Sequence, residues 1–418
     1  MYRDRVEYSE SVLEIAWRRG DVEVNESRSS ARAVRLATNR GWVICSTTRP
    51  VAWDVLEEEA LRLAGSERAE SSAELAEASL YVGRVMLGES SADPLGEGMR
   101  AVDLARALLE EKGLTGEVVL VFSETERRLE HPSGSASERK TLSELYVYAD
   151  ARLEGSRAVG SAHAAVLGPP SKISPKSVES LVEKAARRAL WGLRAKKLSP
   201  LERGPKTVLL MGEASAAFFH ELSHLLEADV PEHIALGTLV SSKSLTVYDD
   251  PFDPESPASV FFDDEAVSAR KRTLVEDGVA VGLLHTRETA SLHGDAPGSA
   301  RGLFHRPKAM QSTIVVSSGD NWRESEIVEE TRSGLLIDGV VEAELRGGTV
   351  RLVPEEAWIV AKGEVREPIK LEELKLPLLH SLTRIDAVGR AAYLRASYEK
   401  KHLVAERAPW VRTVAYVA

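Results

Sequence analysis

The chain has 418 residues, of which 54 are Lys or Arg and 65 are Asp or Glu, so its formal net charge is −11. This acidic balance argues against a protein that coats nucleic-acid phosphates, and a hydrophobic share of 43% excludes a chain that is disordered throughout. Cys45 is the single cysteine, which excludes an internal disulfide and a cysteine-rich zinc module. Because a domain has about 100–200 residues, the length predicts two or three domains.

The sequence lacks the patterns that direct a chain into or across a membrane. Its longest apolar stretches, such as Val279–Leu284, are far shorter than the ~20 residues of a membrane helix. The first residues alternate in character and are charged, whereas a secretory signal has a basic start and an apolar core. We therefore expect a cytoplasmic protein that does not span a membrane. Amides deamidate at high temperature, and the scarcity of Asn and Gln predicts a thermophilic source.

Antiparallel strands and helices are predicted in the first half of the chain. Alternating apolar residues, interrupted by Gly20 and Gly41, predict strands between Val6 and Thr48. Apolar residues at helical spacing predict three helices, over Trp53–Ala64, Met99–Lys112 and Ser177–Leu193. Further strands are predicted over Glu117–Phe122, Thr141–Leu153 and Ser156–Ala164.

A polar segment with Pro and Gly, Lys196–Pro205, predicts the boundary between an N-terminal domain over 1–200 and a C-terminal domain over 201–418. The second domain is predicted to begin with a strand over Thr207–Met211 and a helix over Ser215–Asp229, which Pro231 ends. Strands follow at Val260–Phe262, Lys271–Glu276, Val279–His285, Thr313–Ser317, Gly334–Ile337, Glu342–Leu345, Thr349–Val353 and Ala357–Lys362. The predicted fold is α+β, with an N-terminal antiparallel sheet with helices and a strand-rich C-terminal domain.

The helix predicted over 215–229 carries a pattern with specific chemistry, His-Glu-x-x-His from His220 to His224. At about 100° per residue, His224 lies about 40° from His220 and Glu227 about 20° to the other side, so the three share one stripe. Imidazoles one turn apart bind a single Zn²⁺, and the Glu after the first His points to the open coordination position. We therefore predict a zinc site, or a site for another divalent metal, with His220 and His224 as ligands and Glu221 as general base of peptide hydrolysis.

A simpler interpretation places both histidines on a solvated helix face, with Glu221 and Glu227 as ordinary helix formers. The aromatic and aliphatic residues on the opposite face argue against a fully solvated helix. The carboxylate clusters Asp249–Asp250 and Asp263–Glu265 lack the ligand spacing of an EF-hand loop, so we expect solvated turns there.

The stretch from His220 to Asp229 resembles the signature of the TldD/PmbA proteins, which are often described as modulators of DNA gyrase. The similarity covers nearly the whole chain, and the helix is its most specific part. Outside the helix, the similar segments of the C-terminal half are Phe262–Glu265, Leu274–Val279, Gly282–His285, Gly294–Ala296, His305–Pro307 and Gly319–Asp320. In the N-terminal half they are Val34–Arg35 with the turn at Gly41, and the turn Ser133–Ser135.

The resemblance implies a cytoplasmic metallopeptidase that acts on short or unstructured peptides. It also implies two-domain subunits that enclose the catalytic chamber as a homodimer or as a heterodimer with a family paralogue. The acidic net charge disfavours nucleic acid as a partner. The chain departs from the family in having two residues rather than three between Glu221 and His224, which is the more regular spacing for a zinc helix.

The sequence alone does not determine the third metal ligand. The family's metal-bound cysteine lies in a region that corresponds to Ser397–His402, where this chain has no cysteine. Cys45 lies in a Val-Ile-Cys run typical of a buried strand. The candidates are therefore Glu227, on the helix stripe, and His402, in the corresponding region. A site with two ligands would bind metal weakly, so the alternative function is a non-catalytic TldD/PmbA-type partner subunit with a degenerate metal site.

Overall fold

The computed structural model describes residues 2–39, 41–66, 74–198, 203–242, 245–318 and 322–417, and the labelled helices and strands lie within those ranges. The predicted domain boundary at 200/201 and the segment Gly319–Asp320 lie outside the described residues. None of the helices in these ranges has the length and apolar content that crossing a bilayer requires.

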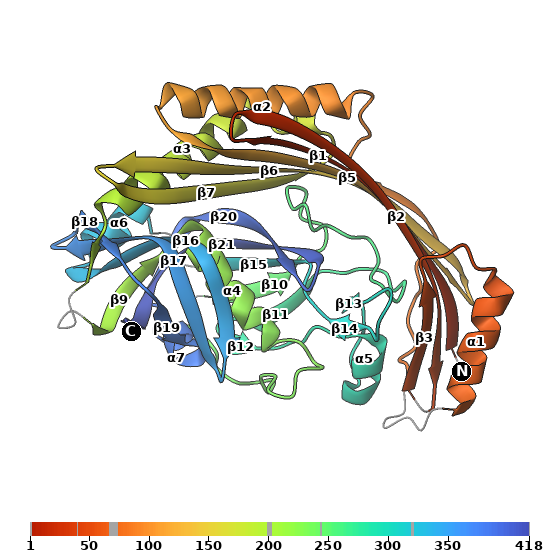
Figure 1. Cartoon of the computed structure of the whole chain (residues 1–418). Coiled ribbons are helices and arrows are strands. Elements are labelled where there is room, and N and C mark those ends of the chain that lie inside the picture. The colour runs from red at the N-terminus through yellow and green to blue at the C-terminus, as the bar shows by residue number, and fades with distance from the viewer. Residues whose placement is uncertain are drawn as a thin grey trace.

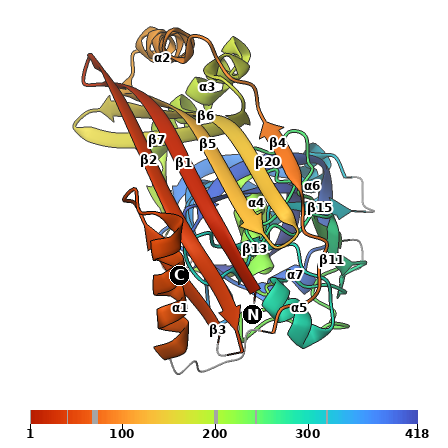
Figure 2. The same ribbon diagram turned by 90° about the vertical axis from the view of Figure 1, so that its right-hand side faces the viewer.

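Long antiparallel strands form the N-terminal sheet, in the order β3-β2-β1-β5-β6-β4, and β7 also pairs with β6. Only the β4–β6 pair is parallel among the pairs of this sheet in the described ranges. Seen face-on, the long strands lie side by side, whereas from the side they arch over the C-terminal half (Figures 1 and 2). The strands are β1 (Tyr2–Arg18), β2 (Asp21–Thr38), β3 (Gly41–Thr47), β4 (Gly83–Leu87), β5 (Thr115–His131), β6 (Gly134–Leu153) and β7 (Ser156–Leu167).

Three helices pack on this sheet, as the sequence predicts: α1 (Trp53–Ser66), α2 (Pro94–Glu111) and α3 (Pro175–Arg194). Helix α3 begins where Ser174 accepts a hydrogen bond from the Ser177 amide and Pro175 occupies the first turn. The apolar faces of α2 and α3 share one core with β1, β5 and β6. Helix α1 packs on β2 and β3 at the other end of the sheet (Figure 2). Cys45 packs against this cluster.

The C-terminal half is a mixed sheet, which contains twelve strands within the described ranges, and a short separate hairpin. Its strands are β8 (Lys196–Lys197), β9 (Gly204–Leu210), β10 (Leu245–Asp249), β11 (Arg272–Glu276), β12 (Val279–Ala280), β15 (Thr313–Ser318), β16 (Ser333–Arg346), β17 (Thr349–Ala361), β18 (Glu364–Lys370), β19 (Leu374–Pro377), β20 (Ala387–Glu399) and β21 (His402–Val417), and the hairpin is β13 (Ala300–Arg301) with β14 (Lys308–Ala309). Its helices are α4 (Gly212–His224), α5 (Arg287–His293), α6 (Glu324–Glu329) and α7 (Leu378–Thr383). The predicted α+β class is confirmed.

Some predicted strands of this half differ from the structure. The segments Gly334–Ile337 and Glu342–Leu345 belong to one strand, β16, which has a register shift between Val340 and Glu342. The segment Val260–Phe262 is not a strand, because its polar backbone groups are satisfied by loop contacts such as Val260 N to Pro251 O. The long C-terminal hairpin β20–β21 was not predicted, since Arg, Tyr and Glu interrupt its apolar pattern.

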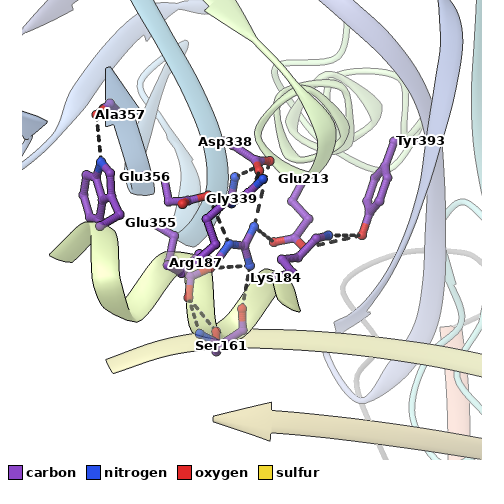
Figure 3. Close-up of polar contacts among 12 residues, drawn as sticks. Ser161, Lys184, Arg187, Glu213, Asp338, Gly339, Glu355, Glu356, Ala357 and Tyr393 are labelled. Carbon is purple, nitrogen blue, oxygen red and sulfur yellow. Dashed lines mark hydrogen bonds and ion pairs between the residues drawn. The ribbon is translucent and has the colours of Figure 1, made fainter. Parts of the chain in front are cut away.

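A buried charge cluster joins α3 to the C-terminal half (Figure 3). Arg188 of α3 is almost fully buried and forms ion pairs with Glu213 at 3.1 Å and Glu355 at 2.7 Å. Its neighbour Arg187 forms ion pairs with Asp338 and Glu356. Since these acids belong to α4, β16 and β17, the cluster fixes the N-terminal half against the elements around α4.

A second contact between the halves corrects the expectation for Asp263–Glu265. All three acidic side chains are buried rather than solvated. Asp263 accepts hydrogen bonds from backbone amides, Asp264 pairs with Arg127 of β5, and fully buried Arg35 of β2 donates to the Asp264 carbonyl. Burial is possible here because each carboxylate has amide or guanidinium donors from surrounding elements, which offset the cost of desolvation.

Candidate metal centre

Helix α4 carries the predicted motif and lies inside the C-terminal half, among β15, β16, β20 and β21 (Figure 1). Phe218, Phe219 and Leu222 are fully buried in the main core, which anchors the helix. His220 and Glu221 are also largely buried, at 7% and 5% exposure. This excludes the interpretation of the motif as a solvated helix face.

The helix ends at His224, five residues before the predicted end at Asp229. After His224 the chain turns and pairs with another segment, since Leu284 N donates to Leu226 O at 2.7 Å and Ala228 N donates to Leu284 O at 3.0 Å. These tertiary hydrogen bonds replace the helical ones and overrule the local helix propensity. Glu227 therefore lies in the turn after α4, and the prediction that it shares a helical stripe with the histidines is wrong.

Carboxylates hold the Nδ1 atoms of both motif histidines. His220 Nδ1 lies 2.7 Å from Oε1 of fully buried Glu406, and His224 Nδ1 lies 3.1 Å from Glu227 Oε1. An ionised carboxylate only accepts, so each contact is a hydrogen bond in the tautomer that carries the proton on Nδ1; Gln311 Nε2 also lies 3.0 Å from His220 Nδ1. The two Nε2 atoms are then available as ligands, which is the arrangement that carboxylates enforce on metal-binding histidines.

The two Nε2 atoms face a third carboxylate, that of Glu399 at the end of β20. Glu399 Oε2 lies 3.7 Å from His220 Nε2 and 3.9 Å from His224 Nε2. Its other oxygen, Oε1, pairs with Lys400 Nζ at 2.9 Å. Sequence reasoning did not single out Glu399, although it lies inside the segment that the family resemblance marked, because a lone Glu in an unpredicted strand carries no metal pattern.

Glu221 completes the group. One ligand atom each from His220, Glu221 and His224 lie within 4.8 Å of one another. Burial raises the pKa of Glu221 above its ordinary value, against the lowering effect of the two histidines and of a backbone hydrogen bond from Leu345. A carboxyl group with a raised pKa beside a candidate metal position is suited to accept and return a proton.

Acidic groups outnumber basic ones around the histidines. Burial by itself would lower the pKa of His220, but the charge of Glu406 and the contacts with Glu399 and Glu406 outweigh it and raise the pKa to about 10. The contact with His220, and next the contact with Lys400, lower the pKa of Glu399 to about 2. The same surroundings that stabilise an imidazolium favour a divalent cation.

A cavity of about 490 Å³ opens beside these residues. Glu221, His224 and Glu399 line it, together with residues at the end of β16. Strand β16 pairs with β9 only at Leu335–Ile337, so over Glu342–Arg346 it pairs with β17 alone among the described strands. An edge of β16 that pairs with no described strand therefore borders the candidate centre, and its Leu345 amide donates to Glu221.

The other residues considered from the sequence lie elsewhere. His402, at the start of β21, contacts His305 with ring centroids 6.2 Å apart, and its pKa is lowered by burial against the opposing charge of Asp264. Cys45 lies on β3 of the N-terminal sheet, in the hydrophobic cluster with α1. The structure thus brings together His220, Glu221 and His224, and adds Glu399 from a distant part of the chain.

The residues present fit a divalent metal. Two imidazoles have protonated Nδ1 atoms and convergent Nε2 atoms, a carboxylate oxygen faces both, and a further carboxyl group lies within reach. Imidazole and carboxylate are donors that Zn²⁺ accepts in catalytic sites, usually as three protein ligands with one open position. The fold and this centre define an α+β protein of two sheets with a histidine–carboxylate metal site.

Comparison with known proteins identifies the family. Residues 204–412 match the PmbA/TldA metallopeptidase C-terminal domain. This match covers half of the chain and includes α4 and both strands of the β20–β21 hairpin up to residue 412. The chain belongs to the PmbA/TldD metallopeptidase family, as the resemblance predicted.

Individual relatives agree with this assignment. A metalloprotease of Methanocaldococcus jannaschii is 31% identical over 262 residues, which are 57% of this chain and 55% of the relative. A metalloprotease of Methanothermobacter thermautotrophicus is 27% identical over 414 residues, which are 92% of this chain and 88% of the relative. The match thus spans about half the length of the first relative and most of the second. The structure of TldE from Thermococcus kodakarensis has the same fold, with a TM-score of 0.80, 17% identity and coverage of 100% of this chain and 96% of that one.

Proposed function

We propose that this protein is a metal-dependent peptidase that hydrolyses short or unstructured peptides, with zinc as the metal. The observation that carries the proposal is that His220, Glu221 and His224 each place a ligand atom within 4.8 Å of the others. Bound zinc would supply a Lewis acid that polarises the peptide carbonyl and acidifies water. The metalloprotease names of the two archaeal relatives support this reaction class.

Glu221 acts as the general base and acid in this proposal. Its raised pKa favours acceptance of a proton from water and transfer of that proton to the leaving amine. His220 and His224 are held by Glu406 and Glu227, so that their Nε2 atoms stay directed to one point. Residues of α4 and of the end of β16 line the cavity beside this point.

The unpaired edge of β16 supplies a binding mode for extended peptides. A peptide that adds to Glu342–Arg346 as a strand would gain main-chain hydrogen bonds that do not depend on its side chains. Such pairing requires an extended substrate, so folded proteins would be poor substrates. Unfolded casein and quenched fluorescent peptides are suitable probes, with a folded protein of similar size as the control.

The test is the substitution Glu221→Gln, which keeps the size of the side chain and removes its basicity. We expect the variant to retain about one equivalent of metal and to lose about 10²–10⁴-fold in kcat, the usual contribution of a general base. Metal content by mass spectrometry and peptide turnover measure the two effects separately. Full turnover by the variant would remove Glu221 from the mechanism.

The oligomeric state is also a proposal, and it rests on membership of the family. We infer a dimer, of identical subunits or with a paralogue, that encloses the site. Sedimentation of the purified chain, alone and after coexpression with a paralogue, distinguishes these forms. A metal-free chain after expression in zinc-supplemented medium would favour the alternative, a non-catalytic partner subunit, over the peptidase.

A further inference from the structure

The strongest unassigned feature of the molecule is the carboxylate that faces the two histidines from a different part of the chain. We propose that Glu399 is the third protein ligand of the metal and completes a site of two histidines and one glutamate. The inference rests on the proposed function, since it concerns the same metal. It adds a donor from outside the helix motif, a glutamate in the segment Ser397–His402 where this chain has no cysteine.

The distances suit a shared metal. Ligand atoms about 2.0–2.2 Å from a tetrahedral zinc lie about 3.3–3.6 Å from one another. The separations of 3.7 and 3.9 Å between Glu399 Oε2 and the two Nε2 atoms exceed this range by only a few tenths of an ångström. A small contraction around a cation would bring Glu399 Oε2 and each Nε2 atom to the separation of two ligands, and the two rings already lie with centroids 4.9 Å apart.

Strand β20 orients the Glu399 side chain toward α4. Successive side chains of a strand alternate between its faces, so Arg395, Ser397 and Glu399 point to one side of β20. Arg395 and Ser397 both contact Glu406, the residue that holds His220 Nδ1. On the other face, Tyr398 donates to Glu144 of the N-terminal sheet at 2.7 Å. One strand thus orients both a histidine and the proposed ligand.

The turn after Glu399 fixes its carboxylate further. Glu399 pairs with His402 across a two-residue hairpin turn, and the intervening Lys400 and Lys401 have φ values of 47° and 73°. Such turns normally use Gly or Asn, since positive φ is costly for a residue with a Cβ. Lysine at the first position places an ammonium group on Glu399 Oε1, which leaves Oε2 to face the histidines. Local strain beside a functional group is a common feature of binding sites.

The other acidic candidates have different positions. Glu227 and Glu406 contact Nδ1 atoms, on the side of each ring away from Nε2. Glu221 is the neighbour of His220 on the helix and serves as the base in the proposed reaction. Glu399 is the described carboxylate with an ion-pair distance to both Nε2 atoms. A carboxylate is a harder donor than a thiolate, so the site should resist reagents that attack thiols.

The test compares four substitutions in the full-length chain: Glu399→Ala, Glu399→Gln, Glu399→Cys and, as the control, Glu232→Gln. Glu232 is an exposed carboxylate that lines the same cavity, so its loss changes the charge equally. Zinc affinity is measured by competition with a chromophoric chelator. Loss of a partner outside the coordination sphere costs about 10–100-fold in metal affinity, so we expect the Ala and Gln variants to lose more than about 100-fold and the control to lose little.

Glu399→Cys gives a readout that a structural role would not produce. If position 399 coordinates the metal, the new thiolate binds zinc with a bond of about 2.3 Å in X-ray absorption, which the wild type lacks. Cobalt substitution should likewise give a thiolate charge-transfer band in this variant alone. Alkylation of thiols should release metal from the Cys variant and not from the wild type, whose single cysteine lies on β3.

The outcomes separate this inference from the proposed function. Zinc-free wild-type protein would overturn the proposed function itself. Wild-type zinc binding with unchanged affinity in folded Glu399→Ala and Glu399→Gln, or without a sulfur ligand in Glu399→Cys, would overturn the assignment of Glu399 only. Near-ultraviolet circular dichroism of each variant establishes that it is folded, and the Cys variant decides the assignment if Glu399→Ala fails to fold.

Discussion

At the scale of single residues, the candidate centre depends on which ring nitrogen each histidine presents. The carboxylates of Glu406 and Glu227 fix the tautomers of His220 and His224 through their Nδ1 atoms. Sequence spacing suggested Glu227 as a ligand, but the structure gives its Oε1 atom a contact with Nδ1 instead. Glu227 therefore has the geometry of a residue that orients a ligand.

Replacement of Glu227 tests this orienting role. We expect Glu227→Gln to weaken zinc binding by about 10–100-fold, because the amide holds the His224 ring less firmly and no longer supports its basicity. Titration against a competing chelator measures the effect, with Glu232→Gln as the control. The zinc-bound variant should keep the wild-type X-ray absorption spectrum. A loss as large as that of Glu399→Ala would show that Glu227 is itself a ligand.

At the scale of elements, the centre is assembled from a helix and a hairpin that are far apart in sequence. Helix α4 supplies His220, Glu221 and His224, whereas the β20–β21 hairpin supplies Glu399 and Glu406. The hairpin turn contains two lysines with positive φ, which is an unfavourable choice for stability. Lys400 forms an ion pair with Glu399, which offsets part of this cost. Lys401 is exposed.

The strain at Lys401 predicts a stabilising substitution. Its φ of 73° suits glycine, so we expect Lys401→Gly to raise the free energy of unfolding by about 0.5–1 kcal/mol. Urea denaturation measures the change. Lys206→Gly, within β9, is the matched control and should destabilise the protein, because glycine in an ordinary strand position only adds chain entropy to the unfolded state. A destabilised Lys401→Gly variant would contradict the interpretation of the turn as strained.

At the scale of the whole molecule, buried ion pairs join the two sheets. The cluster around Arg188 links α3 to α4, β16 and β17 (Figure 3). The turn at Asp263–Glu265 links to Arg35 and Arg127 of the N-terminal sheet. Both clusters satisfy most of their charges. The exceptions are Arg188 Nε, Glu265 Oε1 and Glu356 Oε1, which are buried without a hydrogen-bond partner among the described residues.

Glu356 gives the interface a pH dependence. Burial, together with the charge of Asp338, raises the pKa of Glu356 to about 7 despite Arg187 and Arg188. In the unfolded chain this group ionises near pH 4.5, so between about 4.5 and 7 the unfolded state loses its proton first and stability falls as pH rises. The amide in the Glu356→Gln variant does not ionise, so the stability of this variant does not fall with pH for this reason.

This prediction compares the pH dependence of the unfolding free energy in Glu356→Gln and in the wild type. The unfolding free energy of Glu356→Gln minus that of the wild type should become more positive by about 1–3 kcal/mol between pH 4.5 and 7 and then level off. Urea denaturation at a series of pH values measures it. Glu372→Gln, at an exposed carboxylate, should show no such trend. A difference that stays constant with pH would contradict the raised pKa.

The fold class, most N-terminal elements and the His220–Glu221–His224 motif could be predicted from the sequence, because they depend on local periodicity. Alternation over residues 6–48 and helical spacing over 177–193 reflect which side chains face a core, and this information lies within a few neighbouring residues. Two histidines one turn apart share a helix face in any context that keeps the helix.

How the motif is completed depends on contacts between distant parts of the chain. The helix end at His224 depends on hydrogen bonds with Leu284, and the approach of Glu399 and Glu406 depends on a hairpin more than 170 residues later. A single glutamate has no spacing that marks it as a ligand. Its role is set by which strand packs beside the helix and by which face of that strand it occupies, and these long-range contacts leave no local trace in the sequence.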